Sequence, residues 1–244
     1  EFSHVLGLPD FYDSDYENSG GRSNHPNKWS VMADGSYNNI GRTPVGYSLY
    51  ERYSVGFIDE PQKIEAEGSY TLEPLYSSYT GYRIDTPKDD EFFLLENRQK
   101  NAFKWDADLP GSGMLVYRVD FSDPYVWNNN KVNCDPSHNY YELIRACGAH
   151  QNFQEGYYDS ADDAFPGGGN VKELNNSTTP ASLNTWSGEP VKWGLSDIKM
   201  TDGLITFDID NAYVLKSLTL PETASVGEGM KKKLELTIKP NINT

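Results

Sequence analysis

The sequence predicts an α+β fold in which β-strands dominate, and three observations support this prediction. Short stretches rich in β-branched and aromatic residues recur from about residue 62 onward, separated by turn residues. They are not separated by long helical segments, which favours a mainly antiparallel sheet or sandwich over a parallel sheet. Only two good helical patterns stand out, and both lie before residue 58.

The chain opens with the end of a helix. Phe2 and Val5 are apolar at helical spacing, and Gly7 is a natural left-handed stop. A loop rich in Asp, Asn, Gly and Ser then covers residues 8–29.

A second helix is predicted over residues 43–57. Thr43 can cap it, Pro44 suits its first turn, and Gly56 can end it.

The predicted strands follow one another closely along the rest of the chain. They cover residues 63–75, 82–86, 91–98, 113–121, 140–146 and 203–211. Glu96 and Arg98 alternate on one strand face, where a structural ion pair is expected. Residues 165–190 form a long loop-like stretch, and such loops are usually functional, tied by a metal or partly disordered.

Composition narrows the class of protein. The 244 residues carry a formal net charge of −15 and a sequence pI of about 4.6. This acidity argues against nucleic acid or an anionic membrane as partner, because both need a basic face. No apolar run approaches the roughly 20 residues that cross a bilayer, so no transmembrane segment is predicted. A Tyr-rich composition with few Lys is typical of β-rich secreted proteins.

The chain has only two cysteines, Cys134 and Cys147. An isolated close pair in an acidic, Tyr-rich chain favours one disulfide and an oxidising compartment. Two unpaired buried thiols are the alternative.

The opening residues carry a metal-site pattern. Glu1 and His4 fit the second and fifth positions of H-E-x-x-H, in which two histidines one helical turn apart bind one zinc. The residue after the first histidine can act as general base. Gly7 breaks the helix, and Asp10 stands where H-E-x-x-H-x-x-G-x-x-H/D places its third ligand. The first histidine of the pattern would immediately precede Glu1.

Three further blocks accompany "EFSHVLGLPDFYD". They are "KWSVMADGSYNN", which places Met32 in a turn, "TPVGYSLYERYSVGF" and "FFLLENRQKNAFKWDADLPGSGMLVYRVD". Together the four blocks resemble the catalytic domain of the M6 family of secreted bacterial metallopeptidases, the immune inhibitor A group. The resemblance covers residues 1–210.

The resemblance implies a metzincin-like zinc endopeptidase that cleaves proteins or peptides and is secreted or lies at the bacterial cell surface. It implies that His4 and Asp10 bind zinc, that Glu1 is the general base, and that Met32 lies under the metal without binding it. The chain then starts just after the first zinc histidine, so we expect a catalytic-domain fragment that is inactive by itself.

Calcium is a further predicted ligand. Asp13, Asp15 and Glu17 alternate within one acidic loop, and calcium prefers several oxygen ligands from such a loop. Solvated loop acidity is the alternative. The same reasoning applies to a second acidic run, which contains Asp159, Asp162 and Asp163.

The last segment has its own character. Residues 212–244 are basic in an acidic chain and read as strand, turn and strand. They resemble the start of a bacterial immunoglobulin-like repeat of the Big_2 type. A closing hairpin of the preceding domain is the alternative. The predicted domains are therefore residues 1–211, the C-terminal portion of an M6-like peptidase domain, and residues 212–244.

Two other functions remain open from the sequence. One is a non-catalytic β-sandwich module that binds glycans or host proteins through exposed aromatic residues. The other is a pseudoprotease in which the first histidine is absent.

Overall fold

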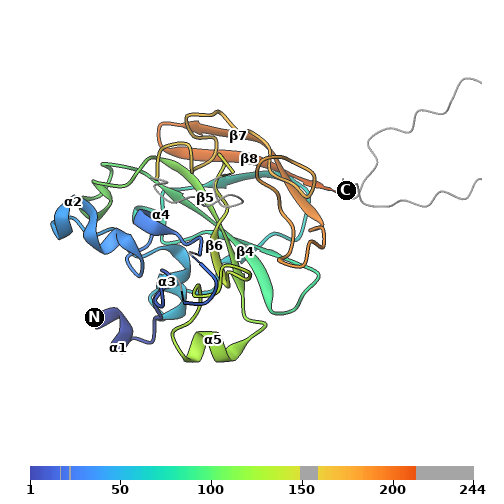
Figure 1. Cartoon of the computed structure of the whole chain (residues 1–244). Coiled ribbons are helices and arrows are strands. Elements are labelled where there is room, and N and C mark those ends of the chain that lie inside the picture. The colour runs from blue at the N-terminus through green and yellow to red at the C-terminus, as the bar shows by residue number, and fades with distance from the viewer. Residues whose placement is uncertain (17, 22, 149–158, 213–244) are drawn as a thin grey trace, which may run out of the picture.

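Two β-sheets frame the chain (Figure 1). The computed structural model describes residues 1–16, 18–21, 23–148 and 159–212. The larger sheet has the strand order β1 (Gln62–Lys63), β3 (Tyr82–Asp85), β4 (Glu91–Arg98), β5 (Gly113–Asp120) and β6 (Tyr141–Leu143). The smaller sheet has the order β2 (Gly68–Leu72), β8 (Leu204–Asn211) and β7 (Trp193–Thr201). Every pairing is antiparallel except that of β1 with β3.

Strands β4 and β5 form the centre of the larger sheet, and every residue of both strands is buried. Successive side chains of a strand point to opposite faces. Phe93 and Leu95 of β4 therefore join one hydrophobic core, whereas Phe92 and Leu94 join another. A sheet that is covered on both faces reads as a continuous apolar run, which is the pattern seen in "FFLL".

The first core lies between the two sheets. Phe93 and Leu95 pack there with residues of the smaller sheet such as Leu195, Ile205 and Phe207. The chain thus contains a β-sandwich.

The second core lies on the opposite face of the larger sheet, under the helices (Figure 1). The helices are α1 (Phe2–Val5), α2 (Asn38–Gly41), α3 (Leu49–Ser54), α4 (Leu75–Ser78) and α5 (Pro124–Asn128). Short 3₁₀ turns cover Asn27–Trp29, Asp34–Tyr37 and Lys104–Asp106. The backbone N–H of Leu49 at the start of α3 donates to Glu96 Oε2 of β4 over 2.5 Å. Helix α3 is thereby attached to the central strand by a side chain.

The predicted ion pair on β4 is confirmed. Arg98 Nη1 lies 3.3 Å from Glu96 Oε1, and Arg98 Nη2 lies 2.5 Å from Asp106 Oδ1. All three side chains are buried. Burial of a charge is tolerable only with such partners, so this cluster is structural.

The long loop-like stretch over residues 165–190 is tied to the larger sheet. The N–H of Trp186 donates to Glu91 Oε1 over 2.6 Å, and the Arg118 guanidinium lies 4.6 Å from the Trp186 ring centroid. Burial raises the pKa of Glu91 to about 7. The loop is therefore held against the central strands β4 and β5 by polar and aromatic contacts.

The two predicted helices exist, with different bounds. Gly7 and Gly56 have positive φ angles of 98° and 76° just after α1 and α3, as the sequence predicts. The second helix begins later than predicted, however. Ser48, not Thr43, is its N-cap, because Ser48 and Glu51 form a reciprocal capping box.

The sequence analysis missed strand β7, and the predicted strand over residues 63–75 is two strands, β1 and β2, which belong to different sheets. The alternation of β7 is interrupted by a register shift between Ser196 and Lys199, where Asp197 has a φ of 51°. The predicted immunoglobulin-like segment, 212–244, lies outside the described residues apart from residue 212. Within the described part of the chain, no helix combines the length and apolar character that a bilayer crossing needs.

Candidate metal centre and the methionine turn

Helix α1 is a single turn that carries His4. None of its residues is buried. The hydroxyl groups of Ser3 and Tyr47 lie 2.6 Å apart, and this hydrogen bond joins the helix to the segment before α3. Gly7 then turns the chain back toward the helix, so that residues 8–10 pass beside the His4 ring.

The His4 ring has a fixed orientation. Its Nδ1–H donates to the carbonyl of Leu8 over 2.8 Å, so Nε2 is the ring nitrogen that faces Asp10. His4 Nε2 lies 3.3 Å from Asp10 Oδ1. Metal-bound histidines typically donate their second ring N–H in this way, because the bond fixes the tautomer and the ring direction. The structure thus brings together the two residues predicted to bind zinc.

Asp10 is held by Asn130, a residue that the sequence analysis did not identify. Asn130 Nδ2 donates to Asp10 Oδ2 over 2.7 Å, and the Asp10 N–H donates to Asn130 Oδ1 over 2.5 Å. This two-point clamp leaves Asp10 Oδ1 facing His4. Asn130 is 120 residues away in the sequence, so no local pattern reveals the contact.

Met32 lies in a buried turn on the core side of this segment. Its carbonyl accepts from the N–H of Phe11, the residue after Asp10, over 2.8 Å. Its N–H lies 3.1 Å from Ser30 Oγ and 3.4 Å from Glu51 Oε1. Met32 is therefore joined to the Asp10 segment by its backbone and to helix α3 through Glu51.

Glu51 is the buried group that organises this turn. Besides Met32, Ser30 Oγ donates to its Oε1 over 2.5 Å and the Ser48 N–H donates to its Oε2 over 2.6 Å. Burial raises the pKa of Glu51 above its ordinary value, although these donors and Arg98 oppose the shift. The S-x-x-E spacing of Ser48 and Glu51 is a capping-box signal that the sequence could have supplied.

Glu1 stands at the N-cap of α1 and is exposed. Its carbonyl accepts from the His4 N–H over 3.1 Å, while its carboxylate makes no capping hydrogen bond. The carboxylate is thus accessible and not committed to holding the helix.

No disulfide joins Cys134 and Cys147, so that prediction is wrong. Cys134 Sγ lies 3.2 Å from Ser14 Oγ, whereas Cys147 Sγ lies 3.5 Å from Asp163 Oδ1. The two thiols are therefore directed to different parts of the structure, and their proximity in sequence did not indicate pairing.

The predicted calcium residues have different outcomes. Donor atoms of Asp13 and Asp15 lie near each other, and Glu17 lies outside the described residues. In the second acidic run, Asp159 Oδ1 lies 3.0 Å from Arg145 Nη2 and Asp163 Oδ1 lies 3.7 Å from Arg145 Nε. The buried guanidinium of Arg145 pairs with both carboxylates, so it supplies the positive charge that a metal ion would bring to this site.

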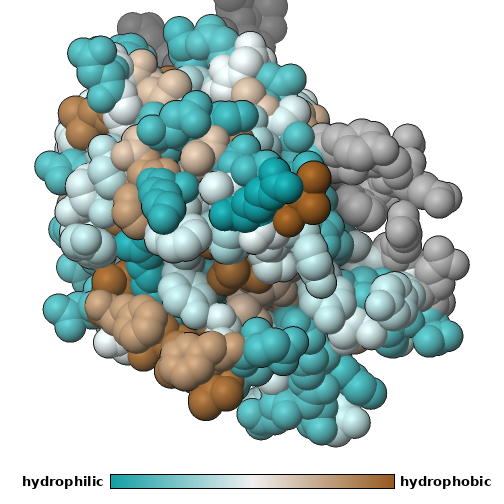
Figure 2. All heavy atoms as spheres, turned by 90° about the vertical axis from the view of Figure 1, so that its left-hand side faces the viewer, coloured by the Kyte–Doolittle hydropathy of each residue, from teal (hydrophilic) through white to brown (hydrophobic). Residues whose placement is uncertain are grey.

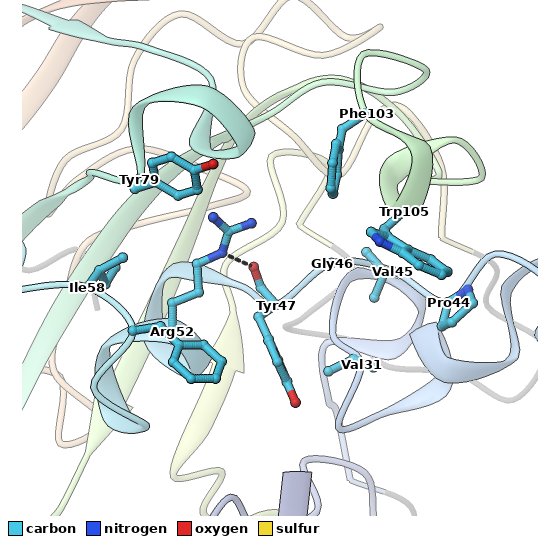
Figure 3. Close-up of a pocket in the computed structure, with 11 residues that line it drawn as sticks. Val31, Pro44, Val45, Gly46, Tyr47, Arg52, Ile58, Tyr79, Phe103 and Trp105 are labelled. Carbon is cyan, nitrogen blue, oxygen red and sulfur yellow. Dashed lines mark hydrogen bonds between the residues drawn. The ribbon is translucent and has the colours of Figure 1, made fainter. Parts of the chain in front are cut away.

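A pocket of about 470 Å³ lies beside this region. Hydrophobic side chains gather low on the face that carries α1 and α2 (Figure 2). The pocket itself is shown in Figure 3, where Phe103, Trp105 and Tyr79 surround its opening and Arg52 donates to the Tyr47 carbonyl over 2.9 Å. It is lined by Val31, Pro44, Val45, Gly46, Tyr47, Arg52, Phe57, Ile58, Tyr79, Phe103 and Trp105.

Comparison with known proteins gives one finding. A family model described as immune inhibitor A peptidase M6, catalytic domain, matches residues 1–54. The matched residues contain α1, the Asp10 segment, the methionine turn and α3. No curated protein and no solved structure matches the chain. The chain is therefore similar to a peptidase catalytic domain over its first 54 residues.

Proposed function

We propose that residues 1–211 are the C-terminal portion of a metzincin-like zinc endopeptidase domain of the M6 type. The observation that carries this proposal is the convergence of His4 Nε2 and Asp10 Oδ1 over 3.3 Å. The family match over residues 1–54 supports it independently.

The residues fit a zinc ion in their donor chemistry. Zinc takes imidazole nitrogen and carboxylate oxygen, and catalytic sites use three protein ligands with one open position. His4 and Asp10 supply one donor of each kind, and each is oriented by a second contact, with Leu8 and Asn130 respectively. This chain's own residues therefore account for two ligands of a three-ligand site.

Each residue then has a defined task. A bound zinc ion supplies Lewis-acid polarisation of the peptide carbonyl. Glu1, which precedes His4 by three residues, is proposed to take a proton from the attacking water and to pass it to the leaving amine. Met32 gives the site an apolar floor, and Asn130 holds Asp10 in place.

Zinc affinity in two extended chains tests the proposal. One chain carries a histidine added directly before Glu1, and the matched control carries an alanine there. The added histidine completes H-E-x-x-H, so we expect it to raise zinc affinity on the order of 100-fold over the alanine control. Isothermal titration calorimetry against a competing chelator measures the difference.

Three variants in the histidine-extended chain separate ligands from base. His4→Ala and Asp10→Asn should each remove most of the gain. Glu1→Gln should leave zinc affinity unchanged, because Glu1 is proposed to move protons and not to bind the metal. Equal zinc affinity in the histidine and alanine chains would refute the peptidase assignment.

A binding module is the second candidate function, and the aromatic pocket favours it. Phe57, Tyr79, Phe103 and Trp105 line that pocket and are also among the exposed large apolar residues. Exposed aromatic rings supply large contact areas at low entropic cost, which suits recognition of a glycan or a host protein. Retention on a glycan array that Trp105→Ala abolishes, with no zinc gain in the histidine-extended chain, would favour this function.

Secretion or display at the cell surface stays a prediction from the resemblance. It accords with the acidic, Tyr-rich composition.

A further inference from the structure

Three potential metal ligands from two distant segments meet beside the Asp10 clamp. One donor atom from each of Asp13, Asp15 and Cys134 lies within 4.8 Å of the other two. Ser14 fastens the two segments together, because its hydroxyl donates to the Asn130 carbonyl over 3.0 Å and lies 3.2 Å from Cys134 Sγ. The cluster is therefore formed by tertiary structure and not by one acidic loop alone.

Within the part of the chain that the structure describes, no cationic side chain balances these two carboxylates. Among the described residues, no ion pair involves Asp13 or Asp15. Asp13 is buried, and its partners are the backbone N–H groups of Ser23 and Asp15, at 3.2 and 3.3 Å. Burial, with the neighbouring Asp15, raises the pKa of Asp13 to about 6. A bound cation would supply the charge that this arrangement lacks.

Two oxygen atoms at the cluster also lack hydrogen-bond partners. Asp15 Oδ1 and Ser23 Oγ are both buried and unpartnered in the part of the chain that the structure describes. Ser23 is only 1% exposed, and its N–H already bonds Asp13. Buried polar atoms in native proteins are nearly always paired, so these two atoms indicate a missing ligand.

We propose that Asp13, Asp15 and Cys134 form a second, structural metal site that binds a thiophilic divalent cation of the Zn²⁺ class. Thiolate and carboxylate together suit zinc, whereas calcium takes oxygen ligands only. Because the cluster includes the Cys134 thiol, we expect zinc here and not the calcium predicted from the acidic loop alone. The Ser23 hydroxyl or a water completes the coordination.

The site would act on the candidate metal centre without touching it. A cation held by Asp13, Asp15 and Cys134 links the segment after Asp10 to the segment after Asn130. These two segments carry the clamp that orients Asp10. The proposal stands independently of the peptidase assignment, because it needs only the three side chains.

Cobalt substitution tests the site in the 244-residue chain under reducing conditions. A thiolate bound to Co²⁺ gives a sulfur-to-metal charge-transfer absorption in the near ultraviolet, which carboxylate and imidazole ligands do not give. We expect one such band per chain at saturation. Cys134→Ser should abolish the band, while the matched control Cys147→Ser should retain it. His4→Ala should also retain it, which separates this site from the candidate zinc centre.

A second variant changes a carboxylate of the site and leaves Cys134 in place, because substitution of a buried cysteine can disturb folding. Asp15→Asn keeps the thiol and the side-chain shape, and we expect it to weaken Co²⁺ binding on the order of tenfold or more. A band that is absent from the wild-type chain, or that Cys147→Ser removes, overturns the proposal. Calcium stabilisation that equals that of Co²⁺ and survives Cys134→Ser also overturns it, because the site would then use oxygen ligands alone.

Discussion

Replacing Glu51 by alanine should destabilise the chain more than any exposed charge substitution. Two donors would lose their acceptor, namely the Ser30 hydroxyl and the backbone N–H of Ser48, and the Met32 N–H would lose the longer of its two contacts. A buried donor left unpaired costs about 1–3 kcal/mol. Removing a buried carboxylate relieves its own desolvation, which offsets part of this cost. We therefore expect a loss of about 3–5 kcal/mol in the free energy of unfolding.

Glu51→Gln gives a sharper version of the same experiment. Glutamine has the same shape and keeps one carbonyl acceptor, but its amide NH₂ faces a donor. The expected loss is about 1–3 kcal/mol, the cost of one unsatisfied group. Glu65→Ala removes an exposed glutamate and serves as the control, with an expected change within about 0.5 kcal/mol.

Urea unfolding followed by tryptophan fluorescence measures these differences. Trp29 is fully buried and lies three residues before Met32, so its emission reports on the methionine turn. Unchanged slopes with shifted midpoints would show that stability alone has changed. The reasoning fails if Glu51→Ala is as stable as Glu65→Ala, or if Glu51→Gln is no milder than Glu51→Ala.

Three further predictions follow from single contacts. Asn130→Ala should lower the zinc affinity of the histidine-extended chain on the order of tenfold, because Asp10 loses its clamp, and unchanged affinity in a chelator competition would contradict this. Glu91→Gln should flatten the dependence of thermal stability on pH. The pKa of Glu91 is raised from 4.5 to about 7 in the folded chain, so its stabilising contribution is complete at low pH and is lost as pH rises through about 7. Melting temperatures at pH 5 and pH 8 that differ equally in both chains would contradict it. Gly35→Ala should cost about 1–3 kcal/mol because a Cβ would run into a backbone carbonyl of the methionine turn, whereas Gly169→Ala has space and should be nearly neutral in the same urea assay.

Local patterns in the sequence predicted the local parts of the fold. The pairing of His4 with Asp10 depends on one helical turn and one glycine stop, so spacing alone indicated it. Strand β4 was predicted with its observed bounds because "EFFLLENR" is flanked by turn residues. The start of α3 was misplaced because a Thr-Pro signal was preferred to the S-x-x-E signal at Ser48.

The parts that could not be predicted depend on long-range contacts. Asn130 reaches Asp10 across 120 residues, and Cys134 joins Asp13 and Asp15 in the same way. The proximity of the cysteines in sequence suggested a bond that their directions in the fold do not allow. Composition and local spacing carry no information on which side chains from distant segments meet in three dimensions.

The exposure of helix α1 couples metal affinity to packing. No side chain of α1 is buried, so tertiary packing contributes little to the stability of this turn. His4 presents its ring toward Asp10 only while the turn is formed, so the apparent zinc affinity is the intrinsic affinity scaled by the fraction of chains with α1 formed. Phe2 and Val5 are 71% and 78% exposed. Any surface that packs against these two side chains would raise that fraction, and would tighten zinc binding without contacting the metal.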